Sequence, residues 1–256
     1  VKFRNLEEFF TLNEQAEKRF EYVVSWMDCM AKGKSLGRGH MIQGNFISSP
    51  KEENQLDKIH SPKGLKVPFY FPNIALNKLS ISLFNKLYYH KQVRRIQQQK
   101  VHYDPFFYPL DGLHQWNRMY GRRGFYQYQC VVDESQKDAL FDLFRVISKN
   151  GLSSFLSVLK KFSPIHSPGM LSFPRPGYTL AADFPNNGPA TQKLFCEMDH
   201  IVEKVGGRIY PAKDALMSAS FFQKSYPNWQ DFKEFIDPQF SSNFWRRVSK
   251  KVGEKP

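Results

Sequence analysis

The chain has 256 residues, of which 41% are hydrophobic and 16% aromatic, so it can fill a core and lacks the low hydrophobicity of a disordered protein. Its 37 lysines and arginines exceed its 24 aspartates and glutamates, and the formal net charge of +13 favours an anionic partner such as nucleic acid, anionic lipid or a phosphorylated substrate. No apolar run approaches the roughly 18 residues of a membrane-spanning helix. The N-terminal stretch VKFRNLEEFF also lacks the apolar centre of a signal peptide.

The cysteines and histidines argue against a disulfide framework and a metal site. Cys29, Cys130 and Cys196 are odd in number and widely spaced, and the seven histidines never occur as HxH or HxxxH. We therefore expect no metal site and a reducing, cytoplasmic location.

The first part of the chain predicts a helix followed by two strands. Leu6, Phe9, Phe10 and Leu12 lie on one side of an amphipathic helix. Because the chain has no initiator methionine and opens inside this helix, we expect it to be a piece of a longer protein. Residues 21–28 and 38–47 are predicted strands joined by a glycine-containing turn. The polar, proline-punctuated stretch 48–72 is predicted to be a mobile loop.

A second helix is predicted for residues 77–99, with a basic, glutamine-rich end. The residues expected near one face of this helix are Leu79, Leu83, Leu87, Tyr88 and Tyr89.

The central part of the chain predicts the order strand, helix, strand, strand, helix, strand between residues 125 and 209. The three longer strands are expected at 125–132, 155–162 and 177–185. One helix precedes Gly151, and the other starts at Pro189 and stops at Gly206 and Gly207. This order is typical of a split β-α-β unit, so we predict an α+β fold with an antiparallel sheet and helices packed on one face.

Polar residues interrupt these apolar strands. Gln127 and Gln129 are two residues apart and therefore point to the same face of a strand. Lys160 and Lys161 are adjacent and must point to opposite faces. A buried lysine that stays charged needs an anionic partner.

Two further polar residues, Asp183 in LAADF and Lys213 after IYPA, also stand beside apolar residues. Each alone is more often a satisfied structural group, but several in neighbouring strands indicate a ligand site.

Standard catalytic and nucleotide-binding signatures are absent: there is no GxGxxG, GxxxxGK[ST], HExxH or GxSxG. The glycines of KGKSLGRG fit a plain hairpin turn better than a phosphate loop. The basic segments are most often solvated helix faces. They leave open a second function, a non-enzymatic module that binds nucleic acid or anionic lipid through Arg94, Arg95, Arg246 and Arg247.

Several long motifs carry a family resemblance that extends from about Phe20 to Val248. They are EYVVSWMDCMAKGKSLGRG, FFYPLDGLHQWNRMYGRRGFYQYQ, LSFPRPGYTLAADFP and GGRIYPAKDALMS. The chain resembles the C-terminal part of FAD-linked oxidoreductases of the vanillyl-alcohol-oxidase superfamily. Within it, the chain is most similar to the decaprenylphosphoryl-ribose oxidases, which are the flavin subunits of an epimerase. Sugar-lactone oxidases, including those of D-arabinono-1,4-lactone type, are more distant.

The resemblance implies a domain organisation. Residues 1–209 would be the substrate (cap) domain, and residues 210–256 would be a C-terminal segment that returns to an FAD-binding domain. Because most flavin contacts of the family come from that other domain, we expect these 256 residues alone to hold no FAD and to be inactive.

The resemblance also implies an activity and partners. The implied reaction oxidises a hydroxyl of a polyprenyl-phosphate pentose, or of a related aldose or lactone, by hydride transfer to FAD, in cell-wall or polysaccharide sugar biosynthesis. The resemblance implies a short-chain reductase as a partner, which would act in a second epimerisation step. It also implies peripheral contact with the inner membrane, and it implies no nucleic-acid partner.

Site residues follow from the matched motifs. Lys213 corresponds to a catalytic lysine at the pyrimidine edge of the flavin, and Tyr210 to a residue that contacts FAD. The implied substrate-binding residues are Gln127, Gln129, Lys160, Phe162 and Trp26.

The chain departs from the family at three positions. Ala181 replaces a cysteine that faces the flavin, Thr179 replaces an asparagine, and Phe107 replaces a tyrosine. Inhibitors that need the cysteine should therefore not react.

Overall fold

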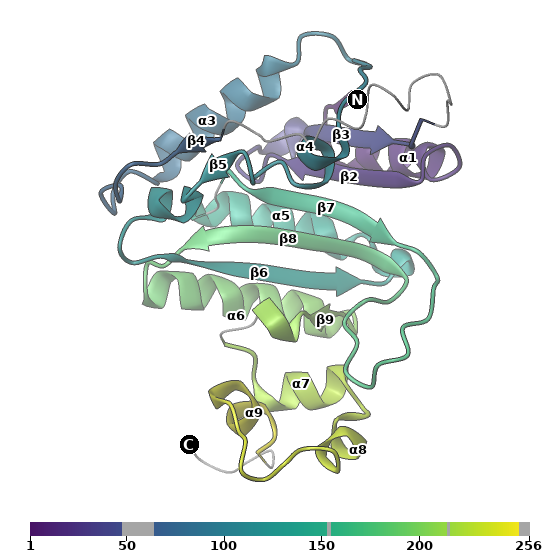
Figure 1. Cartoon of the computed structure of the whole chain (residues 1–256), viewed down its shortest axis with the longest axis vertical. Coiled ribbons are helices and arrows are strands. Elements are labelled where there is room, and N and C mark those ends of the chain that lie inside the picture. Colours follow the sequence, from purple (N-terminus) through teal and green to yellow (C-terminus); the bar gives the residue numbers. More distant parts are fainter. Residues whose placement is uncertain (48–63, 153–154, 214–215, 251–256) are drawn as a thin grey trace.

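The computed structural model describes residues 1–47, 64–152, 155–213 and 216–250, which are arranged around one seven-stranded sheet (Figure 1). The strand order is β1-β3-β2-β7-β8-β6-β9, and each described pair in this sheet is antiparallel. The strands are β1 (Lys2–Phe3), β2 (Tyr22–Met27), β3 (Gly39–Gly44), β6 (Phe125–Val132), β7 (Ser157–Phe162), β8 (Gly177–Pro185) and β9 (Arg208–Ile209). The helices are α1 (Leu6–Ala16), α3 (Lys78–Lys91), α4 (Tyr103–Phe107), α5 (Ala139–Asn150), α6 (Pro189–Lys204), α7 (Ala219–Ser225), α8 (Trp229–Lys233) and α9 (Asn243–Val248).

The predicted split β-α-β unit is confirmed. Along the chain it runs β6, α5, β7, β8, α6, β9, and in the sheet β8 lies between β6 and β7. Strands β6 and β7 are both antiparallel to β8 and therefore run the same way, as a split unit requires. The α+β fold class predicted from the sequence is thus correct.

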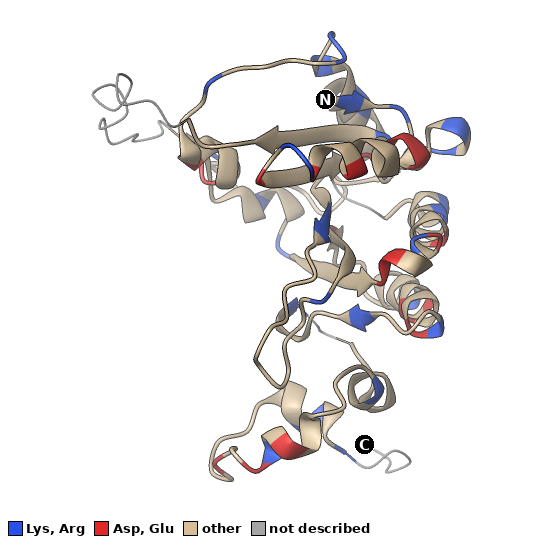
Figure 2. Ribbon diagram, turned by 90° about the vertical axis from the view of Figure 1, so that its right-hand side faces the viewer, with Lys and Arg blue, Asp and Glu red and all other residues tan. Residues whose placement is uncertain are grey.

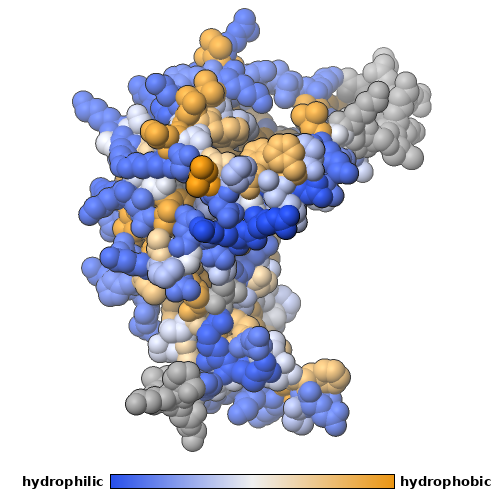
Figure 3. Space-filling model, turned by 90° about the vertical axis from the view of Figure 1, so that its left-hand side faces the viewer, coloured by the Kyte–Doolittle hydropathy of each residue, from blue (hydrophilic) through white to orange (hydrophobic). Residues whose placement is uncertain are grey.

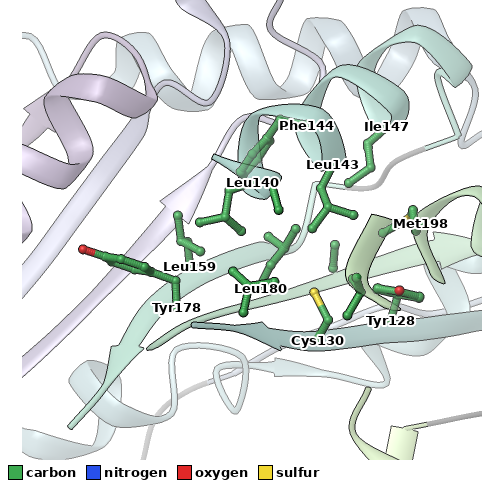
Figure 4. Close-up of a cluster of buried hydrophobic side chains, with 14 of the residues drawn as sticks. Tyr128, Cys130, Leu140, Leu143, Phe144, Ile147, Leu159, Tyr178, Leu180 and Met198 are labelled. Carbon is green, nitrogen blue, oxygen red and sulfur yellow. The ribbon is translucent and has the colours of Figure 1, made fainter. Parts of the chain in front are cut away.

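Helix α5 shows why the helices cover one face of this sheet. Leu140, Leu143, Phe144 and Ile147 recur at helical spacing, are fully buried, and point at the strands (Figure 4). Helices α1 and α6 add apolar side chains to the same core, against inward-facing strand residues such as Leu180. Burial of each large apolar side chain stabilises the fold by about 1.5–3 kcal/mol.

Helix α3 lies on the other face of the sheet, which the sequence did not predict. Its Tyr88 packs on Trp26 of β2, with ring centroids 4.6 Å apart. The helix ends at Lys91 rather than near residue 99, and the next residue, Gln92, has an extended backbone.

The predicted face of α3 is wrong for its leucines. Leu79, Leu83 and Leu87 are exposed, whereas Ile81 and Asn85 are buried together with Tyr89, which was on the predicted face. Hydrogen bonds select this face. The Asn85 amide donates to Asp28 Oδ1 at 3.1 Å, and the Tyr89 hydroxyl donates to the Phe3 carbonyl at 3.0 Å. Because these groups are buried, they need such partners, and the leucines are left to solvent.

Part of the predicted loop 48–72 can be described. Residues 48–63 lie outside the described residues, whereas β4 (Leu65–Lys66) forms a parallel pair with β5 (Leu113–His114). None of the described helices is long and apolar enough to cross a membrane.

The C-terminal helices α7, α8 and α9 form a small lobe at one end of the molecule (Figure 1). The Tyr226 hydroxyl donates to the Ile209 carbonyl of β9 at 2.6 Å, and Phe222 joins the main core. Arg246 and Arg247 lie in this lobe, whereas Arg94 and Arg95 follow α3 at the opposite end. The four arginines of the alternative basic module therefore do not form one patch.

Candidate functional site

Strands β6, β7 and β8 present a polar row of side chains on the face opposite α5 and α6, which we call the polar face. The register of β6 and β8 places Gln127 opposite Asp183, and Gln129 opposite Ala181. Lys160 lies opposite Thr179. Because side chains alternate along a strand, Tyr128 and Cys130 point to the helices instead. The polar face comprises Trp26, Gln127, Gln129, Val158, Lys160, Phe162, Thr179, Ala181 and Asp183.

The two adjacent lysines of β7 lie on opposite faces, as the alternation predicts. Lys161 is on the helix side, where its ammonium contacts Glu134 at 2.8 Å and Glu17 at 3.1 Å. Burial opposes the charge of Lys161, but these two carboxylates outweigh it and raise the pKa of the lysine. Lys160 is on the polar face, 5.3 Å from the ring centre of Phe162, and pairs with no carboxylate among the described residues. One lysine thus has a structural partner, and the other is available to a ligand.

Asp183 is the most strongly perturbed group of the polar face. Its fully buried carboxylate accepts hydrogen bonds from the Gln127 amide at 2.9 Å and the Tyr120 hydroxyl at 3.3 Å. Burial raises the pKa of Asp183 to about 6, against the effect of these two hydrogen bonds and the positive charge of Lys213. A buried carboxyl whose charge is disfavoured weakens the fold at neutral pH, and such groups concentrate at functional sites.

A series of packed aromatic rings connects Phe162, which lies beside Lys160, to Tyr210. Phe162 packs on Phe173 with ring centres 6.0 Å apart, and Phe173 stacks on Tyr210 at 4.7 Å. The backbone N–H of Tyr210 donates to the Gln129 carbonyl at 2.9 Å, which extends the β6–β9 pairing by one residue. Lys160, Phe162, Gln129 and Tyr210 are therefore brought to one region.

Lys213 lies along the same edge of β6 as Tyr210, beside Gln127. It ends a single 3₁₀ turn, Pro211–Lys213, and its backbone N–H donates to the Tyr210 carbonyl at 3.0 Å. Its exposed side chain borders a small hollow between β6 and α6, which is also lined by Gln127, Ile209, Phe195 and Asp199. No ion pair to Lys213 exists within the described ranges, so this cation is also open to a ligand.

Trp26 differs from the other site residues predicted from the sequence. Its indole N–H donates to the Phe155 carbonyl at 2.8 Å, its ring packs under Tyr88, and only 8% of its surface is exposed. In this structure Trp26 supports the wall of the polar face and is covered by α3. Of the departures from the family, Ala181 and Thr179 lie on the polar face, whereas Phe107 packs on Tyr22 of β2 at 4.9 Å.

Two residues of the site were not singled out from the sequence: Tyr120 and Phe173. Asp183 was part of the predicted polar cluster, although the resemblance assigned it no role. Asp183 did give a signal, because it is a charged residue inside the apolar run LAADF. Tyr120 ends a short 3₁₀ helix, Trp116–Tyr120, and Phe173 lies in the irregular segment between β7 and β8, so no periodicity assigns either residue to a face. Their contacts depend on how distant segments meet.

The chemistry of the polar face is that of a binding site for a hydroxyl-rich or anionic molecule. The two glutamine amides both donate and accept hydrogen bonds, and Lys160, which has no carboxylate partner among the described residues, favours negative charge. Across the part of the chain that the structure describes, no three His, Cys, Asp or Glu side chains are grouped to hold a metal ion.

Comparison with known proteins adds to this geometry. The chain is 32% identical over 246 residues to the decaprenylphosphoryl-β-D-ribose oxidase of Mycolicibacterium smegmatis, with 92% of this chain and 53% of that protein covered. This chain is related to an oxidase. It is also 27% identical over 250 residues to an uncharacterized protein in the mprA 5′ region of Streptomyces coelicolor, covering 91% of this chain and 67% of that protein. The chain thus spans about half the length of the first relative and about two thirds of the second. No protein-family model matches the chain.

Proposed function

We propose that the chain is the substrate-binding part of an FAD-dependent oxidoreductase that oxidises a hydroxyl of a polyprenyl-phosphate pentose or a related sugar. The observation that carries the proposal is the polar face, on which two glutamines, a lysine with no carboxylate partner in the described parts of the chain, and a perturbed carboxyl lie together. The similarity to an oxidase named for a decaprenylphosphoryl ribose supports the reaction type and the substrate class.

The residues beside β9 fit one edge of a flavin. Lys213 is an exposed cation next to Gln127, and the Tyr210 ring lies close to the same strand edge. A lysine there would stabilise negative charge on the pyrimidine part of the ring. When bound, FAD supplies the acceptor for the hydride that leaves the sugar carbon.

Substrate binding is assigned to the other polar residues. Because Gln127 gives an amide N–H to Asp183, its carbonyl oxygen is left to accept from a sugar hydroxyl. Gln129 is held in a similar way by Thr179, at 3.3 Å. Lys160 would bind the phosphate, and Phe162 would pack on the apolar edge of the sugar.

Flavin reduction tests this proposal. A longer protein that carries this chain together with its FAD-binding domain, with FAD bound, is mixed without oxygen with a short-chain polyprenylphosphoryl ribose, and bleaching of the flavin absorption is followed. We expect Lys213→Ala to slow bleaching by at least about tenfold. The matched control is Lys204→Ala, an exposed lysine at the end of α6. Unchanged bleaching in Lys213→Ala would refute the assignment of this lysine.

A measurement without flavin tests the proposed substrate binding. Calorimetric titration of the chain with the same sugar phosphate should show binding, and Gln127→Ala should weaken it by about tenfold because a hydrogen bond to a polar substrate group is lost. Absence of binding to the wild-type chain would count against the proposed substrate class.

A further inference from the structure

Helix α3 exposes a row of leucines that no other described element covers. Leu79, Leu83 and Leu87 are four residues apart and so lie along one side of the helix, with 82%, 59% and 64% of their surfaces exposed. Large apolar side chains continue outside the helix, with Ile74 before it and Val93 after it, both more than four-fifths exposed. Figure 3 views the side on which α3 lies and shows hydrophobic side chains gathered in its upper half. Exposed apolar patches of this kind mark interaction surfaces.

The helix cannot rotate to bury these leucines. Its opposite side is held by Asn85, which donates to Asp28, and by Tyr89, which donates to the Phe3 carbonyl. Both of these side chains are buried, so turning the helix would leave polar groups without partners. The leucine row is therefore a fixed feature of the surface.

The charge around the row has one sign. Residues 64–103 contain no aspartate or glutamate, although they include seven lysines and arginines: Lys66, Lys78, Lys86, Lys91, Arg94, Arg95 and Lys100. Lys86 is adjacent in sequence to Leu87, and Lys91 lies one turn beyond it. Arg95 has a protein partner, Glu8, at 2.6 Å. The face shown in Figure 2 differs, because basic and acidic residues are interspersed there.

We propose that α3 and its flanking segments dock on the surface of an anionic phospholipid bilayer. An exposed apolar row flanked by cations is typical of a helix that lies in the membrane interface. The leucines would enter the boundary of the acyl chains, and the lysines would contact the anionic headgroups. A second copy of this chain is a poor occupant, because a segment with seven cations and no carboxylate repels its own copy. The docking surface does not depend on the proposed enzymatic function.

Vesicle flotation of the whole chain tests the proposal. The probes are vesicles of phosphatidylcholine alone and of phosphatidylcholine with about one third phosphatidylglycerol, each at low and high salt. We expect binding to the anionic vesicles only, and weaker binding at high salt.

Two triple variants separate the apolar from the charged contribution. Leu79→Ser, Leu83→Ser and Leu87→Ser together should weaken vesicle binding by at least about tenfold. The matched control replaces three equally exposed apolar residues elsewhere with serine: Ile165, Phe235 and Phe240. Lys78→Gln, Lys86→Gln and Lys91→Gln together should weaken binding by a similar or larger factor, and the control changes Lys18, Lys149 and Lys193 to glutamine.

Several outcomes would overturn the proposal. One is absence of flotation of the wild-type chain with anionic vesicles, and another is equal binding to neutral vesicles. A third is an equal loss in the α3 variants and their controls. If sedimentation instead shows a dimer that the leucine variant dissociates, a second copy covers the row and the bilayer is not its partner. Circular dichroism melts of each variant confirm that the fold is kept.

Discussion

The two faces of the central sheet have opposite chemistry, although their residues alternate along the same strands. On β8, Leu180 and Ala182 face the helices, while Thr179, Ala181 and Asp183 face the other way. The helix side is filled by fully buried apolar side chains, and the polar face holds amides, a lysine and a carboxyl. Because successive side chains of a strand point to opposite faces, one strand can contribute alternate residues to the core and to the site.

Thiol reactivity should separate the two faces most strongly. Burial raises the pKa of Cys130, on the helix side, to about 12, so its reactive thiolate is rare. In Ala181→Cys, made on a Cys196→Ser background, the introduced thiol lies on the polar face. We expect it to be alkylated at least about 1000-fold faster than Cys130, as measured by mass spectrometry of the labelled peptides. Similar rates at the two positions would mean that the faces do not differ in access.

Stability should respond mainly to the helix side. Leu180→Ala removes a fully buried side chain and should lower the free energy of unfolding by about 2–5 kcal/mol in urea denaturation. Val158→Ala on the polar face, where the side chain is partly exposed, should cost about 1 kcal/mol or less. Equal losses would contradict the assignment of the core to one face.

The pH dependence of stability should report Asp183. Its folded pKa of about 6 is raised above the ordinary value of 3.8, so the folded state keeps a proton that the unfolded chain releases, and stability falls as the pH rises from about 4 to about 6. Asp183→Asn removes this loss and keeps an acceptor for Gln127. The variant should gain up to about 3 kcal/mol over wild type between pH 4 and pH 7.

The control for this titration is Asp142→Asn, an exposed carboxyl on α5. The difference in free energy of unfolding between Asp142→Asn and wild type should change much less over the same pH range. If the difference in free energy of unfolding between Asp183→Asn and wild type does not change with pH, burial does not disfavour the charged form of this carboxyl.

Hydrogen bonding to Asp183 gives the smallest effect. Gln127→Leu removes a donor to the carboxylate and should raise the pKa of Asp183 by about one pH unit or less, as followed by carboxyl NMR titration. Gln129→Leu, which changes a contact with Thr179 instead, should leave that pKa unchanged. If both variants shift it equally, the pairing of Gln127 with Asp183 is wrong.

These two faces also show how far the sequence alone predicts the structure. Period-two alternation assigned Gln127 and Gln129 to one face and separated Lys160 from Lys161, because it follows from backbone geometry. The split β-α-β unit followed from the order of its elements and from stop signals such as Gly151, which adopts a φ of 78°.

Tertiary contacts explain what the sequence did not predict. The leucines of α3 have the periodicity of a core face, yet Asn85 and Tyr89 find buried hydrogen-bond partners and decide which side faces inward. Likewise, the cover of Trp26 by Tyr88 depends on where α3 packs, which the sequence does not show. The roles of Lys213, Tyr210 and the substrate-binding residues stay predictions.

The central claim is that the polar face binds the substrate, and the two adjacent lysines of β7 test it most directly. Binding of a short-chain polyprenylphosphoryl ribose is measured by calorimetry for Lys160→Gln and for Lys161→Gln, together with the free energy of unfolding. Lys160→Gln should weaken binding by about tenfold or more and leave stability unchanged, because the lysine has no carboxylate partner among the described residues. Lys161→Gln should leave binding unchanged and lower stability by about 1 kcal/mol, because its contacts with Glu134 and Glu17 are lost. Equal effects on binding, or an effect of Lys161→Gln alone, would contradict the account.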